Sequence, residues 1–129
     1  MFNFIKSIFD DETMGEEIIN ANMKTYEASK IMIPNGNKLD WLKATYLGRV
    51  RANGMPPINT DHFSDANYVC IPFSKLPDPL SARMLGIFMI QRERPDICAK
   101  HPKFMNEFNE IINKYNVEPI SSLDDVFHR

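Results

Sequence analysis

Apolar residues recur at helical spacing along most of the chain, and strand-like alternation is nearly absent. The spacing predicts four main helices, over residues 13–32, 38–53, 79–94 and 102–115. A short apolar segment precedes them at 2–9, and a final turn near 122–127 would make a fifth element. We therefore predict an all-α fold, a compact bundle of four to five helices forming a single helical domain over 1–129.

Polar residues with capping chemistry mark where three of these helices begin. Thr13 and Glu16 have the spacing of a capping box, in which each side chain bonds the backbone amide of the other residue. Asn37 can cap the second helix in a similar way. Asp78 followed by Pro79 predicts the start of the third, with the aspartate as cap and the proline in the first turn.

The helices differ in how much of their circumference is apolar. The segment 79–94 is apolar on every side, which is typical of a buried central helix, whereas 102–115 carries one apolar stripe. The second helix has Trp41 and Gly48 nearly opposite its bulky apolar face. We expect this second face to pack in the core or at an oligomer interface, with another element close to Gly48.

The regular pattern is interrupted between the second and third helices. Five of the nine prolines fall within 54–79, together with several polar and aromatic side chains. The segment is too aromatic for disorder, so we predict one long Pro-rich structured loop over about 54–79. Loops of this length are often functional, which makes this one the first place to look for a site.

Polar side chains of this loop form the candidate ligand site. Asp61, His62, Asp65 and Tyr68 lie close together in sequence, and Arg83 follows in the central helix. An arginine among apolar side chains needs a paired acid or a bound anion. Two interpretations therefore stay open: Asp61–Asp65 is only a capped turn with an internal acid pairing Arg83, or these residues converge on a small ligand.

A second set of residues is predicted to form a partner interface, because the chain has more apolar helix surface than so short a domain can cover. It comprises Phe2, Phe4, Ile5, Phe9, Trp41 and Met55. The segment 2–9 could also rest on a membrane surface, but it carries only Lys6, and such helices are normally rich in basic residues. Docking onto the core or onto a second subunit is favoured.

The charge pattern argues against nucleic acid as a partner. The net charge is −2, and the basic side chains of the second helix form no single stripe. Neighbouring sectors alternate in sign: 1–33 is −3, 34–54 is +3, 55–79 is −2, 80–103 is +3 and 104–129 is −3. This pattern indicates either ion pairing between sectors within the fold or a basic face for an acidic partner.

The two cysteines and the absence of known motifs narrow the classes of function that remain. Cys70 and Cys98 lie in no zinc-binding or redox spacing, so we predict no metal, no cofactor and two reduced thiols. No apolar run is long enough for an integral membrane segment, and we expect a cytoplasmic protein. No phosphate-binding glycine loop or hydrolase signature is present, and Cys70 lies in an apolar run typical of an inert thiol.

Two hypotheses of function follow from these observations. The first is a non-enzymatic helical protein that acts by protein–protein interaction, as an adaptor, a regulator or a self-associating homodimer. The second is a small-molecule or anion-binding protein, conceivably an enzyme, with its site between the loop 54–79 and the helix 79–94.

Overall fold

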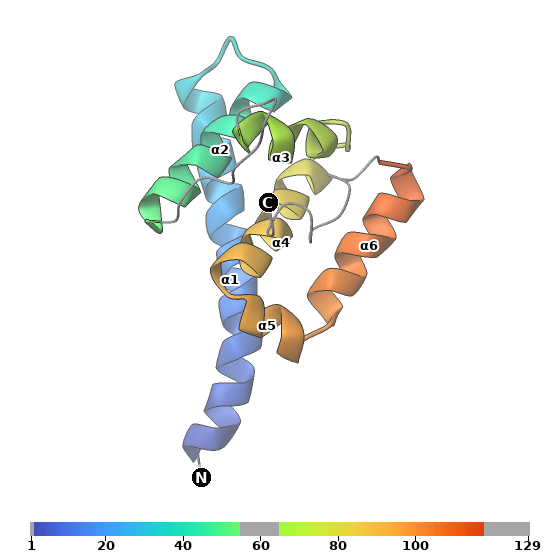
Figure 1. Ribbon diagram of the computed structural model, residues 1–129. Coiled ribbons are helices and arrows are strands. Elements are labelled where there is room, and N and C mark those ends of the chain that lie inside the picture. Colours follow the sequence, from blue (N-terminus) through green and yellow to red (C-terminus); the bar gives the residue numbers. More distant parts are fainter. Residues whose placement is uncertain (1, 55–64, 118–129) are drawn as a thin grey trace.

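The protein is all-α, as predicted. The structure, a computed structural model, describes residues 2–54 and 65–117, with side chains from residue 11 onward (Figure 1). The described residues form six helices and no strand: α1 Phe2–Met32, α2 Lys38–Ala52, α3 Asp65–Ser74, α4 Leu80–Glu93, α5 Pro95–Lys100 and α6 Lys103–Tyr115. The predicted turn at 122–127 lies outside the described residues.

α1 is one continuous helix of 31 residues, so the predicted separate start at Thr13 is wrong. No glycine or proline breaks the chain between residues 10 and 13, and Glu16 is engaged in ion pairs with Arg83 and Lys103. The first turns of α1 extend beyond α5 and project from the rest of the bundle (Figure 1). The apolar residues at 2–9 therefore belong to a projecting helix.

α4 is the central helix, as its apolar circumference predicts. Every residue from Met84 to Ile90 is buried. α1 packs directly on it, because Gly86 has no side chain and a Cβ there would lie 3.1 Å from the Cα of Ile19. A buried hydrogen bond reinforces this contact, since Asn22 Nδ2 donates to the carbonyl of Ala82 at 3.0 Å. The close approach of α1 and α4 organises the core.

α2 begins at the predicted cap. The Asn37 side chain accepts from the Asp40 amide at 2.9 Å, and Asp40 accepts from the Asn37 amide at 3.0 Å. The inner face of α2 then buries Leu42, Tyr46 and Val50. This confirms the predicted bulky packing face of the second helix.

α3 occupies part of the segment that was predicted to be one long loop. Its buried side chains, Ala66, Val69, Cys70 and Phe73, are spaced as on one helix face. Pro72 lies inside the helix and costs about 3 kcal/mol there. Burial of the apolar stripe outweighs that cost, which is why the proline content is a misleading signal for this stretch.

Two further helix starts differ from expectation for local reasons. Asp78 does not cap α4, because its carboxylate accepts from the Tyr26 hydroxyl at 3.1 Å and lies 3.8 Å from Lys30. α5 was not predicted: Pro95 opens it from the first turn, where its missing amide hydrogen has no cost.

Sectors of opposite charge form ion pairs with each other, which confirms the first of the two interpretations of the charge pattern, ion pairing within the fold. Acidic residues of α1 meet basic residues near and within α5 and α6, as in Asp11–Lys100 at 3.1 Å and Glu12–Lys103 at 2.6 Å. Lys38 at the start of α2 lies 3.9 Å from Asp78. These pairs are mostly solvent-exposed, so each stabilises the fold by at most about 1 kcal/mol.

Two glycines in helix interiors provide a matched test of the α1–α4 contact. Gly86→Ala should destabilise the protein by about 1–3 kcal/mol, because the added methyl meets the backbone of Ile19. Gly48→Ala should stabilise it by about 0.5–1 kcal/mol, because Gly48 has open space and alanine is the better helix former. Urea unfolding measures both, and equal effects of the two substitutions would contradict the assigned packing.

Candidate functional site

The predicted ligand residues lie only partly within the described residues. Asp61 and His62 lie outside them, and Asp65 and Tyr68 are on α3. Arg83 donates two hydrogen bonds from its guanidinium to Glu107 on α6 and also lies 4.0 Å from Glu16. An internal acid therefore pairs Arg83.

Arg92, which the sequence analysis missed, occupies the α3 side of α4 instead. It lies nine residues after Arg83, about two and a half turns, and so on the opposite face of the helix. Its Nη1 donates to the Tyr46 hydroxyl at 2.5 Å. Burial and the nearby Asp65 carboxylate raise the pKa of Tyr46, while the Arg92 charge opposes the shift.

One carboxylate oxygen of Asp65 is buried without a hydrogen-bond donor among the described residues. Its Oδ2 is shielded from solvent and has no hydrogen-bond partner among the described residues. A buried carboxylate oxygen without a donor is costly, so such an atom is a candidate point for ligand contact.

Both thiols are buried and remain protonated near neutral pH. Burial raises the pKa of Cys70 far above its ordinary value and raises that of Cys98 to about 11. The nearby charge of Lys43 only partly opposes the shift at Cys70. Cys70 is buried, as the apolar run around it predicts.

Of the predicted interface residues, Trp41 makes contacts within the chain. Its Nε1 donates to the Ile33 carbonyl at 2.8 Å, and its ring meets Tyr26 edge-on at 6.4 Å. Met55 lies outside the described residues. The remaining positions, Phe2, Phe4, Ile5 and Phe9, lie in the projecting part of α1, where the structure describes the backbone only.

An apolar groove runs between α1 and α2 and has a volume of about 360 Å³. We call it the α1–α2 groove. It is lined by Thr25, Ala28, Ser29, Met32 and Ile33 of α1 and its end, and by Ala44, Leu47, Gly48 and Arg51 of α2. The large apolar side chains at its edge are exposed: 80% for Met32, 39% for Leu47 and 36% for Ile33. The described part of the chain leaves these side chains open to solvent.

Gly48 lies in this groove, and the predicted close approach of another element to it is wrong for the described residues. An added Cβ would find Thr25 Cγ2 at 3.9 Å as its nearest neighbour, an ordinary contact distance. Ser29 and Thr25 satisfy their hydroxyls on α1 carbonyls, so the groove floor offers no free donor from them. The floor is consequently lined by small side chains and is largely apolar.

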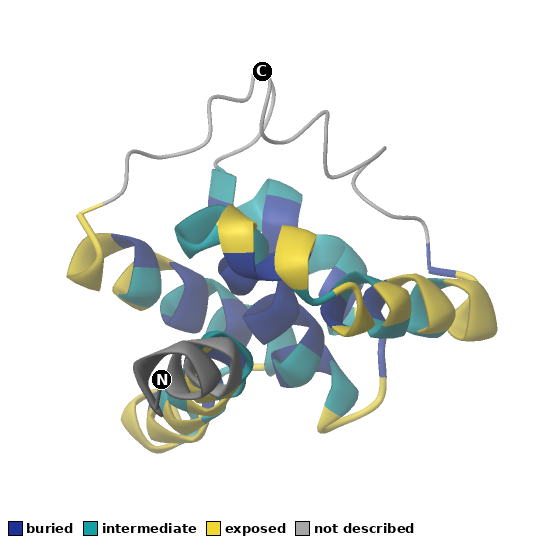
Figure 2. Ribbon diagram, turned by 90° about the horizontal axis from the view of Figure 1, so that it is seen from below, coloured by how far each residue is buried: buried dark blue, intermediate teal, exposed yellow. Residues whose placement is uncertain are grey.

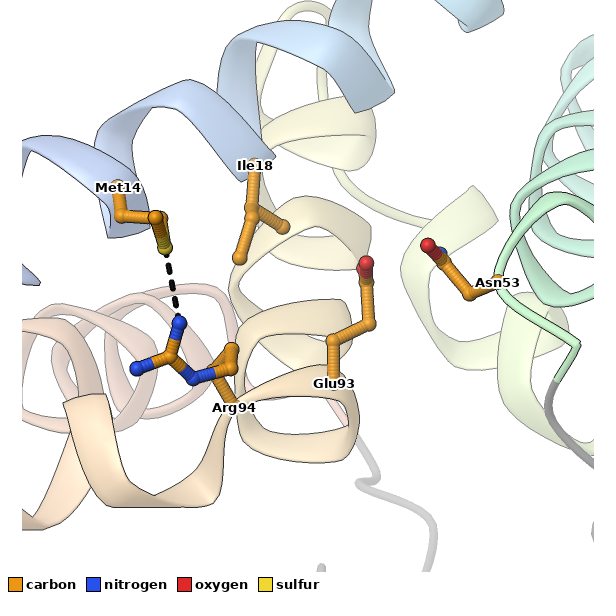
Figure 3. A pocket seen from close by; sticks show the side chains of 5 residues that line it. All are labelled: Met14, Ile18, Asn53, Glu93 and Arg94. Atoms are coloured by element: carbon orange, nitrogen blue, oxygen red, sulfur yellow. Dashed lines mark hydrogen bonds between the residues drawn. The ribbon is translucent and has the colours of Figure 1, made fainter.

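A second hollow of about 380 Å³ lies where α1 passes the end of α4 (Figure 3). Met14 and Ile18 face Glu93 and Arg94 there, and Asn53 from the end of α2 lies across it. Arg94 Nη1 meets the Met14 sulfur at 2.9 Å, while its other nitrogens donate to Asp96.

The charges of this second hollow are largely matched within the fold. Glu93 accepts a hydrogen bond from Arg49 at 3.1 Å, and its side chain is only 10% exposed. Burial raises the pKa of Glu93, although the Arg49 charge opposes the shift. We regard this hollow as weaker evidence for a site than the α1–α2 groove, because its polar groups already have partners.

Comparison with known proteins finds no relative of this chain. No protein-family model, curated protein or solved structure matches the chain. Among the described residues, no helix is long and apolar enough to cross a membrane. Nor do His, Cys, Asp or Glu side chains of residues 2–54 and 65–117 gather in a group that could hold a metal ion. The proposed function therefore rests on the geometry of the described residues.

The Arg83–Glu107 pair predicts a defined pH dependence of stability. The hydrogen bonds from Arg83 lower the pKa of Glu107 below its ordinary 4.5, so the pair stabilises the fold at neutral pH and loses this contribution as pH falls through the lowered pKa. Glu107→Gln should cost about 0.5–1 kcal/mol at pH 7 and nothing well below pH 4. Urea unfolding at several pH values measures the difference.

Glu110→Gln is the matched control, because Glu110 is exposed on the same helix and forms no ion pair with a described residue. Its substitution should leave the pH profile of the wild type unchanged. Equal profiles for Glu107→Gln and Glu110→Gln would contradict the assigned role of the Arg83–Glu107 pair.

Proposed function

We propose that the protein is a non-enzymatic helical module that binds a helical segment of another protein in the α1–α2 groove. The observation that carries the proposal is the row of exposed apolar side chains along this groove, Met32, Ile33 and Leu47. The chain already buries a continuous core of its own, so these side chains are not needed for folding. Grooves between helices are a common docking place for amphipathic helices.

The groove has the features that such a partner requires. Its floor of small side chains, with Gly48 at one wall, leaves room for bulky apolar residues of the partner. Burial of side chains such as Met32 and Leu47 contributes about 1.5–3 kcal/mol each when complete. Arg51 stands at the rim and forms no ion pair with a described residue, so an acidic side chain on the partner would complement it.

A second candidate function, small-molecule binding, is favoured by the unpartnered Asp65 Oδ2 between α3 and the Tyr46 hydroxyl. The fitting ligand carries a hydrogen-bond donor such as an amine or a hydroxyl. A thermal-shift screen of small amines and polyols is the test. Compounds that raise the Tm of the wild type but not of Asp65→Asn would support this candidate, and a screen without any shift would remove it.

Two neighbouring residues test the groove. Met32 and Ile31 are both 80% exposed, but only Met32 lines the groove. Met32→Gln should reduce the fluorescence of the probe anilinonaphthalene sulfonate, because it replaces an apolar wall of the groove by a hydrated polar side chain without adding a charge that could attract the anionic probe. Ile31→Gln, the matched control, should leave probe binding unchanged. Because both sites are exposed, neither change should alter the free energy of unfolding by more than about 0.5 kcal/mol.

Gly48→Leu provides an independent check, because it puts a bulky side chain into the groove at a position where an added Cβ finds its nearest neighbour, Thr25 Cγ2, at 3.9 Å, an ordinary contact distance. It should also lower probe binding while the protein stays folded. Wild-type protein that binds no probe, or Met32 and Gly48 variants with the same fluorescence as the wild type, would contradict the proposal.

A further inference from the structure

α1 carries two rows of residues side by side, and in each row the spacing alternates between four and three. The first row is buried and packs on the body of the protein: Gly15, Ile19, Asn22, Tyr26 and Ser29. The second row begins one residue earlier, and we call it the groove row: Met14, Ile18, Ala21, Thr25, Ala28 and Met32. The groove row contains no charged residue, and such spacing keeps one face of a helix in line with a partner helix.

The groove row connects the two hollows of the surface. Thr25, Ala28 and Met32 line the α1–α2 groove. Met14 and Ile18 line the second hollow, at the end of α4 (Figure 3). Because Met14 and Met32 are separated by five turns of helix, they lie on the same side of α1, about 27 Å apart. The two hollows therefore lie along one face of one helix.

Both ends of the groove row are open to solvent, and α2 borders both hollows. Met14 is 40% exposed and Met32 is 80% exposed. On the α2 side, Arg51 lines the α1–α2 groove and Asn53, two residues later, reaches the second hollow. The charges of the second hollow are largely matched within the fold, so it offers a partner mainly the apolar side chains of Met14 and Ile18. One helix laid along α1 could bury an apolar side chain at each end of the row.

Three charged side chains flank the groove row. Glu17 and Lys24 lie beside the row on its solvent side and are exposed, and Arg51 is exposed on the α2 side. None of the three forms an ion pair with a residue that the structure describes. Arg51 comes one turn after Gly48, where an added Cβ would lie 3.9 Å from Thr25, and so it stands near the middle of the row. The flanks are basic at the middle of the row and acidic toward Met14.

We propose that the partner of this protein is a single acidic amphipathic helix of about 20 residues, lying along the groove row and reaching both hollows. Its apolar residues follow the same alternate spacing and enter the α1–α2 groove at one end and the second hollow at the other. Acidic side chains of the partner lie between Lys24 and Arg51, and a basic side chain faces Glu17. The inference rests on the proposed protein-binding function and names the chemistry of the partner.

The charges disfavour a second copy of the same chain as the occupant. The midpoint of the groove row falls at position 23, next to Lys24. A two-fold axis across the row at this point would bring Lys24 of one copy close to Lys24 of the other, with no acid between them. Like charges that face each other in this way are destabilising, so a different chain with acidic residues at this level is favoured.

Two designed peptides test the inference on the full-length chain. Each is a helix of about 20 residues with leucine at alternate spacings of four and three, flanked by glutamate in one peptide and by lysine in the other. Fluorescence anisotropy of the labelled peptides should show that the acidic one binds at least about tenfold more tightly, and that added salt weakens its binding. The net charge of the chain, −2, would by itself favour the basic peptide.

Substitutions at the two ends of the groove row test how far the partner reaches. Met32→Gln and Met14→Gln should each weaken binding of the acidic peptide at least about fivefold, because each removes an apolar contact. Ile31→Gln, which lies off the row, is the control and should leave binding unchanged. Lys24→Glu should weaken binding of the acidic peptide and strengthen that of the basic one.

The outcomes separate this inference from the proposed function. Binding that depends on Met32 but not on Met14 would confine the partner to the α1–α2 groove, which overturns the inference and leaves the proposed function standing. Equal binding of the two peptides, or no binding of either at millimolar concentration, also overturns it. Dimerisation of the wild type that Met14→Gln and Met32→Gln both weaken would identify a second copy as the occupant instead. Fluorescence of anilinonaphthalene sulfonate is measured separately, and its absence would remove the groove itself.

Discussion

The contact between α1 and α4 at Gly86 supports the rest of the architecture. Because Gly86 lets the backbone of Ile19 come close, α1 lies flat against a helix that is buried on all sides. Each remaining helix packs on this pair or on a neighbour of it, and α2 and α3 close one side while α5 and α6 close the other (Figure 1). A bulkier residue at position 86 would separate the two helices along their shared length.

The α1–α4 contact also explains why part of the surface of α1 is not packed against other helices. One side of the helix is committed to α4, and Asn22 fixes the alignment of the two through its bond to the Ala82 carbonyl. A helix of 31 residues is longer than the body it crosses, so its ends and its outer face remain open. The groove beside α2 lies on that remaining surface.

Sequence patterns predicted the parts of the fold in which local and tertiary preferences agree. The Asn37 cap and the buried α4 were predictable because each rests on residues whose local chemistry decides the outcome. α3 was not, because a buried apolar stripe overrides the local cost of Pro72. Asp78 was misassigned because Tyr26 and Lys30, distant in sequence, compete for its carboxylate.

In the candidate site, too, the local requirement of a residue was predictable, whereas its partner in the fold was not. Arg83 was identifiable from sequence as an arginine that needs an acid, but the identity of that acid, Glu107, depends on where α6 packs. The contact of Arg92 with Tyr46 depends on how α4 packs against α2, which no residue pattern encodes. The groove likewise depends on how far α2 stands from Thr25, a distance that no residue pattern encodes.

The way α6 is attached has a consequence for how the molecule opens. Phe104 and Phe108 are the buried side chains of α6, Met105, Ile111 and Ile112 are only partly buried, and the other links to the body include ion pairs such as Arg83 with Glu107 and Lys103 with Glu12. A helix held in this way has a lower free energy of local opening than a core helix, and dissolved salt weakens its exposed ion pairs further. The amides of α6 should therefore exchange with solvent ahead of those of α4.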